Sequence, residues 1–147
     1  MPFNRVDYYL NRPSSHPVRC HPDTYELYRA EIRQSDGKRN AQPILDCVLA
    51  FKVVAGLDTD GDHTIDEWRK DLTDLEAEEI FEQLKQVRVY IVYQEGQKAQ
   101  GKVFDNDTIK IFYPGDLGNE TITVPSSYYR WKLIEFDIKP YNLEEEL

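Results

Sequence analysis

The chain has 147 residues, of which 40% are hydrophobic. It contains 18 Lys and Arg and 27 Asp and Glu, so its formal net charge is −9. With 10 Tyr and 6 Phe it is too aromatic for a disordered tail, and its polarity excludes a membrane bundle. This length fits a single domain over residues 1–147, and acids spread along the chain would repel phosphate backbones, so we expect no nucleic-acid partner.

The first segment, residues 1–24, contains four of the prolines together with several Ser and Asn, and is expected to be an irregular wrapping segment held by Cys20. Residues 25–34 resemble a strand, and Ser35-Asp36-Gly37-Lys38 supplies residues that tolerate hairpin-turn dihedrals. We therefore predict a hairpin.

The hairpin partner is predicted at residues 44–54, where Cys47, Leu49, Phe51 and Val53 fall on one face at a period of two. Cys47 is expected to point into the core.

A helix is predicted next, because Thr73 and Glu76 have the spacing of a capping box. Its apolar face would hold Leu75, Ile80 and Leu84, and the helix would end near Gln86.

Three further strands and a tail follow. Residues 87–93 alternate as a half-buried strand, residues 94–119 form a loop region with one edge strand at 108–113, and residues 129–139 form the last strand. Residues 144–147 look like a solvated acidic tail. This pattern predicts an α+β fold with antiparallel β-sheets and one short helix.

A membrane helix is not expected, since the longest apolar stretch, residues 47–57, is shorter than the roughly 20 residues that span a bilayer. No basic-then-apolar leader opens the chain, and residues 1–4 look like an arbitrary start. We expect an exported protein whose export signal was removed or lies outside this sequence.

Cys20 and Cys47 are the two cysteines, and no pattern of Cys and His at zinc spacing accompanies them. We expect them to form one disulfide, which would stabilise the folded state by about 3.5 kcal/mol in the chain-entropy model. Two buried free thiols in a cytosolic protein are the alternative.

The run from Asp58 to Asp66 places carboxylates at positions 1, 3, 5 and 9 of a tight loop, a density of hard oxygen ligands that suits calcium. The seventh residue would offer its carbonyl. The predicted ligands are Asp58, Asp60, Asp62, Thr64 and Asp66.

Two departures from the EF-hand pattern make this loop resemble a shorter extracellular type: Arg69 stands at position 12 and His63 at position 6, where a left-handed backbone is needed. Glu67 or Asp71 could complete the ligand shell. Magnesium suits such a site less well, because it keeps its waters. The alternative to a structural calcium ion is a solvated acidic turn.

Catalytic sites have little support in the sequence. His16, Cys20 and His21 could in principle form a Cys–His nucleophile or a soft-metal site, but they lie in a Pro-rich segment and a disulfide would occupy the thiol. No phosphate-binding glycine loop or nucleophile elbow is present. We therefore expect no enzyme, and keep a hydrolase using the loop acids only as a third hypothesis.

Three stretches together resemble PilW-like minor type IV pilins, over about Arg19 to Leu143. They are LDCV at 45–48 leading into GLDTDGD at 56–62, LKQVRVYI at 84–91, and YRWKL at 129–133 running to KP at 139–140.

The resemblance implies a pilin-like head without its N-terminal membrane helix, similar to J-type minor pseudopilins of type II secretion. It implies inner-membrane anchoring of the full-length form before assembly, then a periplasmic or extracellular place at the pilus tip. The implied partners are other minor pilins, the major pilin and a tip adhesin. The rival interpretation is a free extracellular calcium-binding adhesion or binding module.

Overall fold

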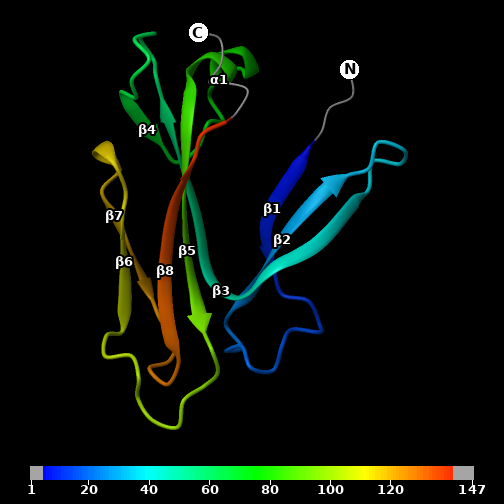
Figure 1. Ribbon diagram of the computed structural model, residues 1–147, viewed down its shortest axis with the longest axis vertical. Helices are drawn as coiled ribbons and strands as arrows, with labels where there is room; N and C mark the ends of the chain where they lie inside the picture. Colours follow the sequence, from blue (N-terminus) through cyan, green and yellow to red (C-terminus); the bar gives the residue numbers. More distant parts are fainter. Residues whose placement is uncertain (1–4, 141–147) are drawn as a thin grey trace. The chain divides into compact units, whose positions relative to one another are not determined.

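The computed structural model describes residues 5–140, and 49% of them lie in strands and 7% in helical segments (Figure 1). The elements are β1 Val6–Asn11, β2 Tyr25–Ile32, β3 Arg39–Leu57, β4 Glu67–Arg69, α1 Ala77–Gln83, β5 Leu84–Glu95, β6 Thr108–Phe112, the 3-10 helix η1 Gly115–Leu117, β7 Asn119–Thr123 and β8 Arg130–Ile138. The expected α+β, pilin-like fold class is wrong: the antiparallel strands and the short helix were expected, but strands dominate to such an extent that the fold is mostly β-sheet. Residues 5–140 contain no helix with the length and apolar character to cross a bilayer.

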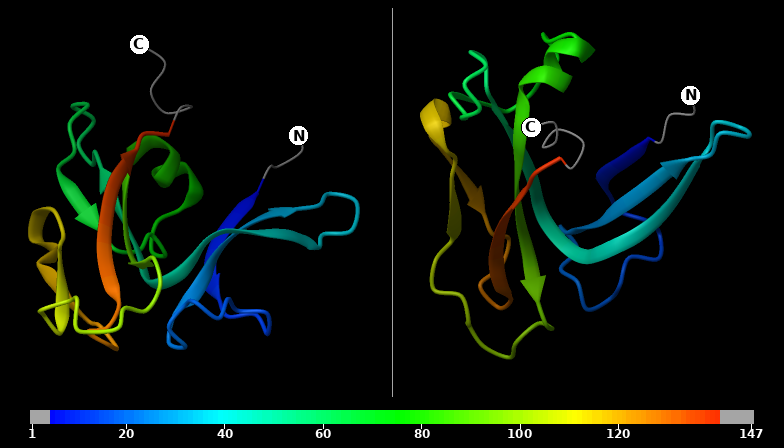
Figure 2. Two further views of the ribbon diagram at one scale, coloured as in Figure 1. Left: turned by 60° about the horizontal axis from the view of Figure 1, so that its bottom comes forward. Right: turned by 45° about the horizontal axis from the view of Figure 1, so that its top comes forward.

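The chain forms two compact units, and the division falls within β3, β5 and β8. Figure 2 traces these strands in the colours of Figure 1. Of the described residues, unit 1 comprises 5–51, 92–107 and 124–133, and unit 2 comprises 52–91, 108–123 and 134–140. The larger sheet has the strand order β1-β2-β3-β5-β8, with β4 paired to β3, and β6 pairs with β7 in a separate two-stranded sheet. The acidic stretch at 144–147 lies outside the described residues.

In unit 1, β2 and β3 form the predicted antiparallel hairpin, with Ile32 opposite Arg39. Gly37 closes the turn with φ +72° and donates its N–H to the Arg33 carbonyl at 2.8 Å. Strand β1 pairs along β2, from Val6 opposite Glu31 to Asn11 opposite Glu26. The expectation that residues 1–24 are irregular throughout is therefore corrected by β1.

The buried face of β3 differs from the prediction because of one residue. Cys47 has φ 56°, and the register of β2 against β3 shifts between Tyr25 and Leu27. Such a bulge adds one residue to a strand and reverses the alternation beyond it. Cys47 is inward and 2% exposed, as predicted, but Val48 is also buried and Val53 is exposed.

In unit 2, the start of β5 is covered on one face by the β6–β7 hairpin. The Tyr90 ring contacts the Tyr113 ring edge-on at 5.2 Å, and Tyr90 is fully buried. Val89 and Ile91, on the alternate face, are each 6% exposed. This part of β5 is therefore buried on both faces, whereas its alternation predicted a half-buried strand.

The helix is shorter than predicted and begins later. Glu76 is its N-cap, and its N–H donates to the Glu79 carboxylate at 3.0 Å. Thr73 instead donates its hydroxyl to Asp71 at 2.9 Å, which removes it from the expected capping role. The predicted partner Leu84 is the first residue of β5.

Candidate functional site

The acidic loop joins two paired strands at one end of unit 2. Leu57 at the end of β3 lies opposite Glu67 of β4, and the N–H of Asp66 donates to the Leu57 carbonyl at 2.9 Å. The N–H of Asp58 donates to the carbonyl of Gln83, the last residue of α1, at 2.8 Å. The loop is thus closed by a short antiparallel ladder and tied to the helix, and Figure 1 shows β4 and α1 at the same end.

Asp58 organises the loop from within. It is 4% exposed, and its two carboxylate oxygens accept the backbone N–H groups of Gly61 and His63, each at 2.8 Å. Loss of water raises the pKa of this carboxyl, but the hydrogen bonds from His63, Gly61 and Asp62 outweigh that effect and hold the pKa below its usual value. Asp58 is therefore an ionised group at neutral pH.

Two residues of the loop adopt left-handed backbone, Gly61 with φ 80° and His63 with φ 71°. These conformations turn successive N–H groups toward the Asp58 carboxylate, as in other backbone concavities that hold a negative group. His63 thus occupies the conformation expected at this position, at a cost that Gly would not pay.

The pKa values of the neighbouring carboxylates shift in different directions. The hydroxyl and N–H of Thr64 donate to Asp62 at 2.7 and 2.9 Å and lower the pKa of that carboxyl. Asp60 accepts the N–H of Asp62, which lowers its pKa, but reduced hydration and the adjacent Asp58 and Asp62 carboxylates raise it overall. Repulsion among the acids thus falls mainly on Asp60, and a cation would relieve it.

The four predicted aspartate ligands come together. One oxygen from each of Asp58, Asp60, Asp62 and Asp66 lies within 4.8 Å of the others. Asp66 also accepts a hydrogen bond from the Thr59 hydroxyl at 2.8 Å, which links the end of the loop to its beginning. Ligation by the Thr64 carbonyl stays a prediction. This arrangement offers carboxylate oxygens of the kind that hard divalent cations prefer.

Of the two residues considered as further ligands, Glu67 and Asp71, the second accepts the Thr73 hydroxyl at 2.9 Å. Arg69, at position 12 of the loop pattern, forms a 2.7 Å ion pair with Asp74. The sequence did not reveal strand β4, because three residues are too few to show a period. The closure of the loop by β4 is therefore evident only in the structure.

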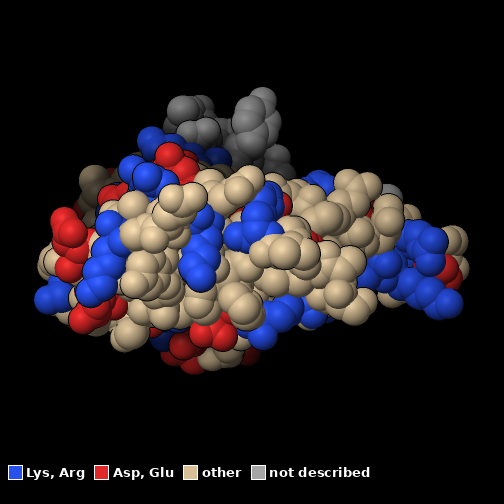
Figure 3. Space-filling model, turned by 90° about the horizontal axis from the view of Figure 1, so that it is seen from below, with Lys and Arg blue, Asp and Glu red and all other residues tan. Residues whose placement is uncertain are grey.

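The net charge is concentrated around this loop. Residues 57–83 contain 11 of the acidic residues and two basic ones, which equals the net charge of −9 for the whole chain. The face shown in Figure 3 carries both Lys and Arg and Asp and Glu side chains among uncharged ones. The excess of acidic over basic residues is therefore concentrated in this part of unit 2.

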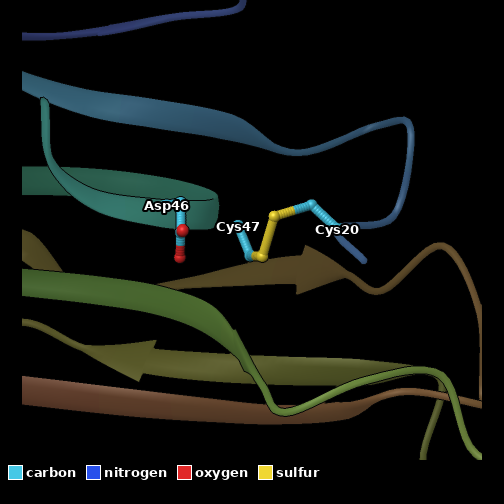
Figure 4. A group of neighbouring side chains, drawn as sticks. All are labelled: Cys20, Asp46 and Cys47. Atoms are coloured by element: carbon cyan, nitrogen blue, oxygen red, sulfur yellow. A yellow bond between two sulfur atoms is a disulfide. The ribbon is translucent and has the colours of Figure 1, made fainter. Parts of the chain in front are cut away.

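A second group of side chains surrounds a Cys20–Cys47 disulfide in unit 1, whose Cα atoms lie 5.0 Å apart. Figure 4 shows the Asp46 carboxylate and the Cys47 side chain extending to the same side of β3. The His16 and His21 side chains instead bond locally: His16 lies 3.1 Å from the Thr24 hydroxyl, and His21 accepts the Asp23 N–H at 3.0 Å. The Cys and His residues weighed as a nucleophile are therefore separately engaged.

Comparison with known proteins gives one family. The family model described as Type IV Pilus-assembly protein W matches residues 7–139. Searches of curated proteins and of solved structures found no match. The matched family consists of structural pilus-assembly proteins and is not a known enzyme family. With most of its length matched, this chain belongs to the PilW family and has a role in type IV pilus assembly.

Proposed function

We propose that the protein is a minor pilin that acts at the start of filament assembly and remains at the pilus tip. The family match over residues 7–139 carries this proposal, since a role in assembly implies contact with other pilus components. The partners we propose are other minor pilins, the major pilin and a tip adhesin. The β-rich fold suits a structural subunit.

The test is complementation of a strain that lacks this gene, with surface pili counted by electron microscopy. We expect few or no pili without the protein and restored pili with it. Immunogold labelling of an epitope-tagged copy would show gold at filament ends for a tip subunit. Labelling along the whole filament would contradict the tip position while leaving the assembly role intact, and unchanged piliation would contradict both and favour a free binding module.

We also propose that the loop from Asp58 to Asp66 binds a structural calcium ion. The support is the convergence of four carboxylates within 4.8 Å on a loop whose backbone is already held by Asp58. An ion would offset the repulsion that raises the Asp60 pKa. Since the loop is tied to β4 and α1, bound calcium would stabilise this end of unit 2.

The calcium experiment compares thermal and urea unfolding with calcium, with magnesium and with a chelator. Calcium at a hundred times its Kd should add about 2.7 kcal/mol to the free energy of unfolding. Asp60→Asn should abolish this response, while Asp105→Asn, the same change at an exposed loop acid, should keep it. Identical curves with calcium and chelator would overturn the calcium proposal without affecting the assembly role.

A further inference from the structure

Arg19 places a positive charge directly on the disulfide of unit 1. Its Nη1 atom lies 4.0 Å from the Sγ atoms of both Cys20 and Cys47. Its Nη2 atom donates to the Asp46 carboxylate, the residue before Cys47 on β3. The same guanidinium thus contacts the two sulfurs and one acid.

This placement shifts the equilibrium between the disulfide and the two thiols toward the thiols. A disulfide is uncharged, whereas its reduction yields thiols whose thiolate forms are stabilised by a nearby Arg. Stabilising the reduced form makes a disulfide easier to reduce. The Arg19 and Asp46 side chains are 42% and 36% exposed, so solvent and salt weaken the effect without removing it.

Gln94 of β5 would keep the two cysteines together after reduction. Its amide accepts the His21 N–H at 2.8 Å and donates to the Arg19 carbonyl at 2.8 Å, and these backbone groups flank Cys20. Gln94 is 4% exposed, so these bonds are partly shielded from water. The backbone on both sides of Cys20 is therefore held to β5 by hydrogen bonds that do not depend on the disulfide.

We propose that Cys20 and Cys47 form a reversible redox pair, with Arg19 tuning the equilibrium toward reduction and Gln94 keeping the thiols in place for reoxidation. A dithiol reductant would supply the two electrons. One of its thiolates attacks a sulfur of the pair, breaking the S–S bond and forming a mixed disulfide. Its second thiol then closes the reductant's own disulfide, and the protein's two sulfurs leave as thiol or thiolate.

The sulfurs are reached from the side of Arg19. Cys20 and Cys47 are only 3% and 2% exposed, while the Arg19 side chain that contacts both is 42% exposed. Displacement of this side chain opens a path for the attacking thiolate. The redox state then decides whether the segment between β1 and β2 is covalently tied to β3.

The experiment equilibrates the full chain with mixtures of reduced and oxidised dithiothreitol at pH 7, followed by acid quench, thiol alkylation and mass measurement. Arg19→Gln should shift the equilibrium constant for reduction about tenfold toward the disulfide, equivalent to about 30 mV for a two-electron couple. Asp46→Asn should shift it in the opposite direction, since it removes the acid that competes for Arg19. Arg33→Gln removes a positive charge from the distant hairpin and should change nothing.

A second arm repeats the titration in 1 M salt, where the difference between wild type and Arg19→Gln should shrink. Circular dichroism of each oxidised variant verifies that it is folded. Equal equilibrium constants for folded wild type and Arg19→Gln would overturn the proposal. A shift of Asp46→Asn in the same direction as Arg19→Gln would overturn it as well, and so would a reduced protein that cannot be reoxidised.

Discussion

The carboxylate of Asp58 accepts a 2.8 Å hydrogen bond from the backbone N–H of His63, a residue whose φ is 71°. The bond requires His63 to adopt a left-handed backbone conformation, which is unfavourable for any residue that has a Cβ atom. The loop is therefore ordered at the expense of backbone strain at His63, and the free energy of unfolding can report that strain.

Replacing His63 by Gly should stabilise the protein by about 1 kcal/mol, because Gly adopts positive φ without strain. Urea unfolding of the metal-free protein measures the change. Ser35→Gly, in an exposed turn where φ is not positive, is the control and should not stabilise. A destabilised His63→Gly would show that the imidazole contributes more than the backbone conformation costs.

Asp58→Asn and Asp60→Asn should change the stability of the metal-free protein in opposite directions at pH 7. Asp58 is buried and accepts several backbone N–H groups, so the loss of its charge and one acceptor destabilises the loop. Asp60 experiences repulsion from Asp58 and Asp62, so its neutralisation stabilises. Thermal melts in chelator give the measurement, and equal signs for the two variants would contradict this division of roles.

Gly56→Ala should destabilise the protein by about 1–3 kcal/mol through overpacking. A Cβ at Gly56 would lie 2.9 Å from the Ile65 side chain and 3.0 Å from the Trp68 ring. Chemical denaturation compares it with Gly101→Ala, where a Cβ meets nothing within 4 Å. Equal stabilities for the two variants would mean that Trp68 moves aside without cost.

Tyr113→Phe should cost about 1 kcal/mol at pH 7, because it removes the 2.8 Å hydrogen bond from the Tyr113 hydroxyl to Glu120. That bond, together with Lys52, holds the pKa of Glu120 below its ordinary value. A lowered folded-state pKa stabilises the protein above the unfolded pKa of about 4.3, and this stabilisation is lost as the pH falls through the folded pKa.

The difference between wild type and Tyr113→Phe should therefore shrink below about pH 4. Urea unfolding at pH 7 and pH 3 tests this, with Tyr128→Phe, a change at a tyrosine that is 40% exposed, as the control. A difference that grows on acidification would contradict the assignment to Glu120.

Gln94→Leu should destabilise by about 2 kcal/mol, because it leaves part-buried backbone groups of His21, Arg19 and Gly96 without their partner. Gln97→Leu, the same change at an exposed position three residues on, should be near neutral. Guanidinium titrations of the oxidised proteins give both values. A neutral Gln94→Leu would show that water replaces the amide.

Local features were predicted well from the sequence. The Ser35–Lys38 turn and the edge strand at residues 108–113 depend on neighbouring residues, and both occur where expected. The spacing of the loop acids and the left-handed backbone at position 6 also follow from short-range geometry. Residue types and spacing therefore determined the turn, the edge strand and the candidate ligands.

Features that depend on distant contacts were not predictable. The bulge at Cys47 reversed the buried face of β3, the covering of Tyr90 by Tyr113 buried β5 on both faces, and β4 closed the acidic loop by pairing with β3. Each requires partners far away along the chain, and a single strand's periodicity carries no information about what covers its second face. The sequence alone determined which groups could meet a cation, while the tertiary structure decided how they are held, because the strand that closes the loop forms by pairing with β3.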